Sequence, residues 1–330
     1  MLSRVAESLF WIGRYAERAE NIARLIDAVR RMVTLPAQFG QSTTNEWSSA
    51  LIAAGARDRL GEAIEAATEE LAVNHLIFDV DNPSSVLNCF SSARENARAV
   101  RANLTQESWE ALNIAWREMR DISLQNARGA QLLDVLDWIK AKSAIFRGST
   151  YGTMMRGDGY DFVRMGAAIE RIDSTARLLD VKYHVLLPSL QDIGSVEDHY
   201  QWLSLLQAAS AQRSYFFATQ EDVTPRGVAK FLILNNRFPR SILFNLNLAD
   251  STVADLEAFY GTAAPCRQPL SILSHRLSEL TIDEIFDSGL HEFLTDLIAQ
   301  NANNALLLAE AYGFAPIIAE EKGLGSDSEQ

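Results

Sequence analysis

The sequence predicts an all-α fold, a helical bundle built from two tandem, internally duplicated helical units. Apolar residues recur every three or four positions through most of the chain, which indicates amphipathic helices, and no run of alternating strands is evident. The segment from Leu9 to Asp27, LFWIGRYAERAENIARLID, returns 153 positions later, from Phe162 to Asp180, as FVRMGAAIERIDSTARLLD. A repeated helix of this length predicts two units of similar size.

The repeat continues beyond this helix. Trp47 is matched by Trp202 and Pro83 by Pro239, with the shift between copies drifting slowly to 156 positions, as small loop insertions would cause. The period is too long for a solenoid of short repeats. We therefore expect a first helical unit at 1–155 and a second at 156–316, packed as one globular body. A disordered acidic tail is expected at 317–330.

Periodicity also places the elements in order along the chain. Besides the two copies of the repeated helix, we expect helices at 60–73, 86–103, 107–124, 130–146, 200–219, 242–260, 270–285 and 289–312. Loops are expected at 36–45, 156–160 and 188–198. The short apolar runs at 75–80 and 231–235 could be mistaken for strands.

Composition limits the function. A chain of 330 residues with 48% hydrophobic residues can bury a substantial core. Its net charge of −13 argues against binding to nucleic acid or to an anionic membrane surface, because both need clustered Lys and Arg. No His or Cys residues have a metal-ligand spacing, so we expect no metal and no cofactor. The absence of a long apolar run predicts no signal peptide or membrane span, and two distant cysteines fit a reduced cytoplasmic protein.

Each copy of the repeated helix carries an adjacent Glu-Arg pair, Glu17-Arg18 in the first and Glu170-Arg171 in the second. Neighbouring helical residues point about 100° apart, so the members of a pair face different partners. Leu25 and Leu178 lie seven residues beyond the two arginines, which predicts that this second face of the helix is covered too. A buried charge needs a partner from another helix. Two interpretations stay open, a structural network that joins the halves and a network that also lines a site for an anionic ligand.

Other charged residues extend this pattern. Glu20 with Arg24 and Asp173 with Arg177 are i,i+4 pairs in the favourable order. A separate predicted helix carries ARENARAVR at 93–101 and could supply further partners. The residues that we expect to contact an anionic ligand, if the network forms a site, are Arg14, Glu17, Arg18, Asn21, Arg24, Ser85, Arg94, Glu95, Asn96, Arg98, Glu170, Arg171, Arg177, Arg240 and Ser241.

Two of these serines belong to a pair of matching Pro-Ser turns. Pro83 and Pro239 each precede an apolar-periodic run, and Pro suits the first position of a helix. Asn82 is a good N-cap for the first of these helices. The turns predict helix starts, and the alternative is that free N–H groups there bind an anion with help from Ser85, Arg240 and Ser241. No glycine pattern forms a phosphate-binding loop.

The chain resembles the bacterial alpha-E proteins, a helical family named for its Glu-Arg motif. The resemblance rests on MLSRVAESLFWIGRYAERAENIARLID at the start, NPSS at 82–85, ARENARAVR at 93–101, GTMMRGDGYDF at 152–162, MGAAIERIDSTARLLDVKYHVLLP at 165–188 and FPRS at 238–241. It implies a context of peptide modification, with circularly permuted ATP-grasp ligases and transglutaminase-like peptidases as partners encoded nearby or fused. The role of the alpha-E component is not implied.

Three functions follow for further testing. The first is a non-hydrolytic subunit that binds an ATP-grasp ligase or its anionic peptide substrate through the polar interior. The second is an enzyme acting on an amide or carboxylate, with Glu17 and Glu170 as acid-base candidates. No nucleophile with a matching His is recognisable. The third is a structural scaffold without a ligand. The sequence leaves formation of a homo-oligomer open.

Overall fold

The computed structural model describes residues 1–34, 45–186 and 196–314, and all regular structure in these ranges is helical. The first half contains α1 (Ser3–Val33), α2 (Glu46–Ala53), α3 (Arg57–Leu60), η2 (Gly61–Ile64), α4 (Glu69–Val73), η3 (Asn74–Phe78), α5 (Val86–Ala99), η4 (Arg101–Asn103), α6 (Gln106–Met119), η5 (Leu124–Asn126) and α7 (Gln131–Thr153). The second half contains α8 (Asp158–Leu186), α9 (Val196–Ala208), α10 (Gln212–Thr219), α11 (Pro225–Leu234), α12 (Ile242–Tyr260), α13 (Arg267–Glu279), α14 (Ile282–Asp287) and α15 (Leu290–Ala311). The all-α prediction is confirmed.

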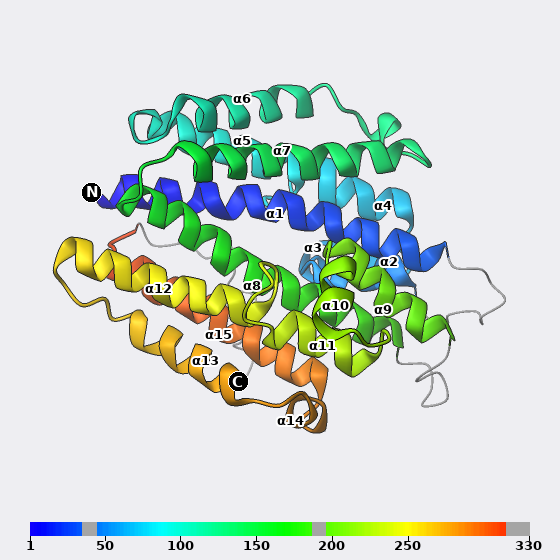
Figure 1. The fold of residues 1–330 in the computed structure, drawn as a ribbon. Coiled ribbons are helices and arrows are strands. Elements are labelled where there is room, and N and C mark those ends of the chain that lie inside the picture. The colour runs from blue at the N-terminus through cyan, green and yellow to red at the C-terminus, as the bar shows by residue number, and fades with distance from the viewer. Residues whose placement is uncertain (35–44, 187–195, 315–330) are drawn as a thin grey trace, which may run out of the picture.

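The two longest helices, α1 and α8, cross at the centre of the molecule (Figure 1). Helices α5 and α7 pack on α1, helices α12 and α15 pack on α8, and α6 and α13 lie outside them. Because both central helices are covered on several sides, several of their charged residues are buried, including Glu17 and Glu170. This is why the network that these residues form lies inside the protein.

Two glycines allow the central helices to touch backbone to backbone. A Cβ atom on Gly13 would lie 2.1 Å from the carbonyl oxygen of Val163, and one on Gly166 would lie 2.0 Å from that of Phe10. No side chain fits at either position. The two contacts are reciprocal, as a duplicated helix pair would make them, and the duplication itself stays a prediction.

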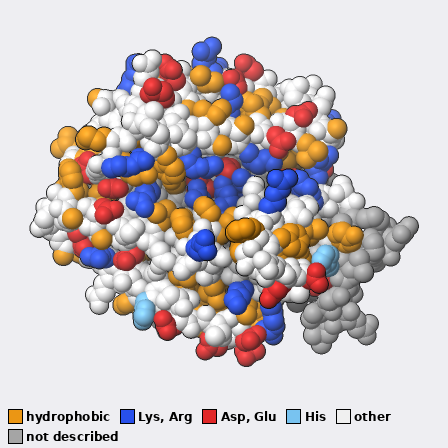
Figure 2. All heavy atoms as spheres, viewed as in Figure 1, with side chains coloured by type: hydrophobic (Ala, Val, Ile, Leu, Met, Phe, Trp, Pro, Cys, Tyr) orange, Lys and Arg blue, Asp and Glu red, His pale blue; other side chains and the backbone are white. Residues whose placement is uncertain are grey.

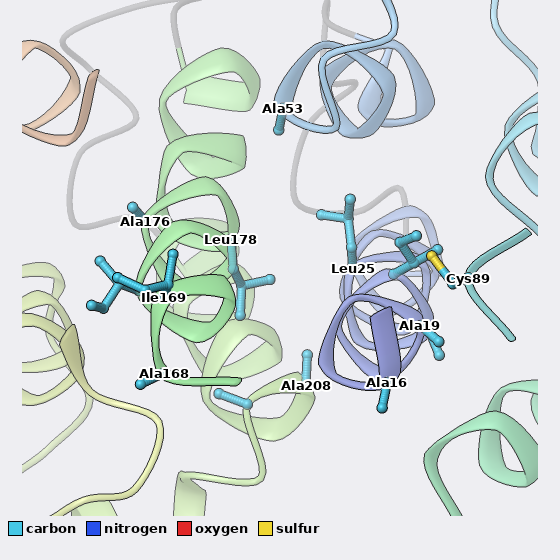
Figure 3. Close-up of a cluster of buried hydrophobic side chains, with 14 of the residues drawn as sticks. Ala16, Ala19, Leu25, Ala53, Cys89, Ala168, Ile169, Ala176, Leu178 and Ala208 are labelled. Carbon is cyan, nitrogen blue, oxygen red and sulfur yellow. The ribbon is translucent and has the colours of Figure 1, made fainter. Parts of the chain in front are cut away.

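The second helix of each half packs on the long helix of the other half. Helix α2 contacts α8, and α9 contacts α1. Figure 3 shows Leu25 of α1 and Leu178 of α8 pointing toward each other between the two helices, with Ala53 and Ala208 on either side. Both leucines are buried, so the prediction that this second face is covered is confirmed. One apolar core therefore runs through both halves.

Helix α12 begins and ends where the periodicity predicts, but several other helices are shorter than expected. The helix predicted at 60–73 breaks at Gly61, which has a φ of +51°. Glycine adopts this conformation readily, whereas other residues rarely do. The segment 200–219 is divided after Ala208, and Ser210 has a φ of +53°. The segment 270–285 restarts at Thr281, which forms a capping box with Glu284.

Connections also differ from the prediction in places. The loop expected at 156–160 is shorter, because α8 begins at Asp158. The apolar runs at 75–80 and 231–235 are helical turns rather than strands. Most of the loops predicted at 36–45 and 188–198, and the tail predicted from 317, lie outside the described residues.

Candidate anion-binding pocket

The two Glu-Arg pairs bind each other across the crossing of α1 and α8. Arg171 of α8 donates from Nε to Oε1 of Glu17 at 2.9 Å, and Arg18 of α1 donates from Nε to Oε1 of Glu170 at 2.6 Å. Neither arginine pairs with the glutamate beside it in sequence. The prediction that adjacent members face different partners is confirmed.

Glu170 is the centre of the first end of this network. Arg14 and Arg18 both donate to its carboxylate, with Arg14 Nε at 2.8 Å from Oε2. Arg18 also donates from Nη1 to the hydroxyl of Ser84 at 3.1 Å. Burial alone would raise the pKa of Glu170, but the two guanidinium groups lower it to about 2. This end consists of a buried carboxylate enclosed by its partners, as the structural interpretation requires.

Glu17 and Glu20 form the second end. Arg240 donates from Nη1 to Glu17 at 3.0 Å and from Nη2 to Glu20, and Arg147 of α7 donates from Nη1 to Glu20 at 2.7 Å. Burial alone would raise the pKa of Glu17, but Arg171 and Arg240 hold it well below its usual range. Asn21 also accepts from Arg240 at 3.0 Å. Three helices and the turn before α12 therefore meet at these two carboxylates.

Arg24 and Arg177 each bind the end of the short helix that packs on their own long helix from the other half of the chain. Arg24 donates from Nη1 to the carbonyl of Ala208 at 2.6 Å, and Arg177 donates from Nη1 to that of Ala53 at 3.0 Å. These carbonyls end α9 and α2, where free acceptors and the negative end of the helix dipole favour a cation. The i,i+4 pairs Glu20–Arg24 and Asp173–Arg177 also form, which confirms that prediction.

The second end opens to a pocket of about 330 Å³. Helix α7, Arg171 of α8 and the turn before α12 supply its lining, Ala144, Arg147, Gly148, Tyr151, Arg171, Pro239 and Arg240. Figure 2 shows Lys and Arg side chains gathered in a band across the middle of this face, at the level of α1 and between α7 and α12. The side chain of Arg147 is 28% exposed, so a ligand in the pocket can reach it.

The arginines of the pocket keep unused hydrogen-bonding capacity. A guanidinium group has five N–H donors, and Arg147 uses only Nη1 toward other residues of the described ranges. Burial, with Arg24 and Arg171 nearby, lowers the pKa of Arg240 to about 10 even though two glutamates face it. A site with crowded positive charges and free donors suits a carboxylate or phosphate group.

Comparison with known proteins agrees with this architecture. Residues 1–312 match the Alpha-E family, whose description is a predicted alpha-helical domain with a conserved ER motif. The chain belongs to the Alpha-E family. Uncharacterized proteins of Mycobacterium bovis and Mycobacterium tuberculosis are 24% identical to it over 313 residues, which is 90% of this chain and 35% of theirs. The chain thus spans about a third of the length of these curated relatives. No solved structure matches it.

The predicted helix at 93–101 does not join the network of this Alpha-E protein. Arg94 on α5 donates to Asn113 at 3.0 Å and stacks over Trp116, and Glu95 is half exposed. Arg98 is 67% exposed and pairs with Glu95, and Asn96 donates to the carbonyl of Ser92. The possibility that this helix supplies partners to the Glu-Arg helices is not realised by these four residues. Glu95 and Arg98 lie on the exposed side of α5 and Arg94 faces α6, while the apolar face of α5 packs on α1.

The Pro-Ser turns do precede helices, but the first helical residue lies three positions after each proline rather than at the proline itself. Ser85 and Ser241 are the N-caps of α5 and α12, and their hydroxyls accept from the backbone N–H groups of Asn88 and Phe244. Asn82 is not the N-cap. Its Oδ1 accepts from the N–H of Ser84 at 3.0 Å, before the helix begins, and its amide donates to the carbonyl of His75. The hydroxyl of Ser241 also donates to the carbonyl of Phe238 at 3.0 Å, and neither serine is part of the pocket lining.

Arg147 and Tyr151 belong to the pocket and were missed by sequence reasoning. They lie on α7, outside the matching segments of the repeat. Arg147 also lies just beyond the end predicted for that helix. No pattern in the sequence connects Arg147 with Glu17 or Glu20, since the contact depends on how α7 packs on α1.

A metal site, a membrane-spanning helix or a reactive cysteine in the part of the chain that the structure describes would point to another function. No group of three or more His, Cys, Asp or Glu side chains there has a geometry that could hold a metal ion. Within the same residues, no helix has the length and apolar character needed to cross a membrane. Cys89 and Cys266 are buried free thiols, as predicted, and burial raises their pKa to about 12 and about 11.

Glu17 and Glu170 are poorly suited to acid-base catalysis. An effective general base or acid has a pKa near the working pH. Arginine partners lower the pKa of both glutamates far below neutrality and occupy their oxygens. The physical role of both groups is therefore to pair with arginines.

Proposed function

We propose that this protein is a binding component that holds the anionic group of a ligand in the pocket formed by Arg147, Arg171 and Arg240. The observation that supports it is that the Glu-Arg network, enclosed at Glu170, opens to a pocket on the side of Glu17. A purely structural network gains nothing from an opening lined by arginines. The low pKa of both glutamates makes binding a better account than catalysis.

The arrangement of the pocket also favours binding. Arg171 and Arg240 are held in place by Glu17 and Glu20, so they lose little side-chain freedom when a ligand arrives. Gly148 leaves open space on the wall, since a Cβ there would meet no atom within 4 Å. A carboxylate or phosphate can therefore approach prepositioned donors.

We further propose that this pocket serves an ATP-grasp ligase and transglutaminase-like peptidase system, in which the ligand is a ligase partner or its anionic peptide substrate. The support is the resemblance carried by the Glu-Arg helices and the FPRS turn, which contains Arg240. About two thirds of each mycobacterial relative lies outside the matched region, which leaves room for fused domains of such a system.

Calorimetric titration with sodium sulfate, at fixed ionic strength, tests the binding proposal. We expect saturable binding at one site and a loss of about tenfold or more in affinity for Arg147→Met, which removes the exposed donor group. Arg98→Met is the matched control, because Arg98 is an exposed arginine on α5, outside the pocket. Absence of binding to the wild-type protein, or equal binding by both variants, would overturn the proposal.

Co-purification tests the proposed partnership. The full chain is expressed together with an ATP-grasp ligase from the same genome, and we expect the two to elute together and ligase activity to depend on this protein. Arg147→Met should reduce that dependence, while Arg98→Met should not. Separate elution together with ligase activity that ignores this protein would refute the partnership, and leave anion binding to be judged by calorimetry.

A further inference from the structure

We propose that the pocket selects ligands that present two negative charges together over ligands that present one. This inference rests on the proposed function and deepens it by naming the class of ligand. It comes from the charges that meet at the second end of the network and from their burial.

The charges at this end do not balance. Two carboxylates and four guanidinium groups are joined there by ion pairs, and these are Glu17, Glu20, Arg24, Arg147, Arg171 and Arg240. Positive charges therefore outnumber negative charges by two. Within the described residues, none of these four arginines forms an ion pair with any other carboxylate.

Neighbouring helix ends leave this surplus nearly unchanged. Arg24 lies against the carbonyl end of α9, which carries a partial negative charge of about half a unit. Helix α12 begins at Ile242, two residues after Arg240, so a similar partial positive charge lies near the pocket wall. The two contributions are opposite in sign and similar in size, so a surplus of about two charges remains for a ligand to neutralise.

Burial keeps the surplus from being screened. Glu17 and Glu20 are 3% and 1% exposed, and the side chains of Arg171 and Arg240 are 7% and 12% exposed. Charges this far from water interact more strongly than charges on the surface, because the surrounding dielectric is lower. A ligand with one charge would leave one of the two surplus positive charges without a counter-charge, and a dianion would leave none.

The N–H groups of the pocket arginines can also donate hydrogen bonds to two anionic oxygens of a ligand. Arg147 has Nε and Nη2 available, and Arg171 lies deeper in the same lining. A phosphate monoester places both charges on one group, and a dicarboxylate, such as an acidic peptide end, places them on two. The shared chemistry is a compact dianion, and the experiment below distinguishes its two sources.

Two matched ligand pairs test the inference by calorimetry at pH 8 and fixed ionic strength. Monomethyl phosphate is a dianion at this pH and dimethyl phosphate is a monoanion of similar shape. Succinate and its monoamide, succinamate, form the carboxylate pair. We expect at least one dianion to bind about tenfold or more tightly than its monoanionic partner. A preference confined to the phosphate pair or to the succinate pair identifies the source of the ligand.

The Arg147→Met variant supplies the second test. Removing one positive charge should reduce the ratio of dianion to monoanion affinity, and Arg98→Met should leave that ratio unchanged. Equal binding of both members in each pair to the wild-type protein would overturn the dianion inference while anion binding stands. Failure of all four ligands and of sulfate would overturn both. A measured unfolding midpoint for each variant shows that the protein remains folded.

Discussion

Gly13 of α1 and Gly166 of α8 occupy matching places in the crossing of the two central helices. At each glycine, a backbone carbonyl of the other helix fills the space that a side chain would need. The glutamates of the two Glu-Arg pairs lie one helical turn further along. The close approach is therefore what lets Arg171 reach Glu17 and Arg18 reach Glu170 directly.

Gly13→Ala should destabilise the protein by about 1–3 kcal/mol or more, because a Cβ atom would lie 2.1 Å from the oxygen of Val163 and the helices would have to separate. Gly152→Ala is the control, since a Cβ there meets nothing within 4 Å and alanine favours the helix by about 0.5–1 kcal/mol. Urea unfolding of both variants measures the difference. Equal stability of the two variants would show that the crossing tolerates a side chain.

Glu170→Ala should cost about 3–5 kcal/mol in the free energy of unfolding, because Arg14 and Arg18 would remain buried without a carboxylate. The matched control is Glu95→Ala, which removes a half-exposed partner of Arg94 and should cost less than about 1 kcal/mol. Chemical denaturation measures both. A loss for Glu170→Ala no larger than that of the control would mean that the enclosed end of the network contributes little to stability.

Acid should weaken the fold through the same carboxylate. The folded pKa of Glu170 is about 2, below its ordinary value of 4.5, so its contribution to stability is complete above pH 4.5 and is lost as the pH falls toward 2. Glu17 acts in the same direction. Unfolding free energies measured across this range should fall more steeply for the wild-type protein than for Glu170→Gln. Parallel curves would contradict the assignment.

Ser241→Ala should destabilise the protein by about 1 kcal/mol and leave sulfate affinity unchanged, because the hydroxyl of Ser241 caps α12 and is not part of the pocket lining. Thermal unfolding and calorimetry on the same sample measure both effects. A loss of affinity without a loss of stability would return Ser241 to the binding site.

Local patterns in the sequence predicted much of the fold. The period of the apolar residues determined the helices, as α12 shows, and the seven-residue spacing of Leu25 from Arg18 predicted a second covered face. The helix breaks at Gly61 and Ser210 were missed, because a positive φ at a single residue leaves the apolar period intact. The adjacency of Glu17 and Arg18 predicted that their partners come from elsewhere.

The pocket was less accessible to sequence reasoning. Arg240 was expected as a donor from its position in the FPRS turn, but Arg147 has no counterpart in the repeat and reaches Glu20 only because α7 packs on α1. Arg94 and Arg98 looked equally suitable and lie outside the network. An arginine belongs to a site through its tertiary neighbours, which no spacing along one helix specifies.

Anomalous diffraction from crystals soaked in sodium selenate would show directly whether an anion binds in the arginine pocket. We expect a selenium peak within hydrogen-bonding distance of Arg147 and close to Arg171 and Arg240, and no such peak in crystals of Arg147→Met. An empty pocket in the wild-type crystals, with selenate bound elsewhere or nowhere, would mean that the pocket does not bind anions.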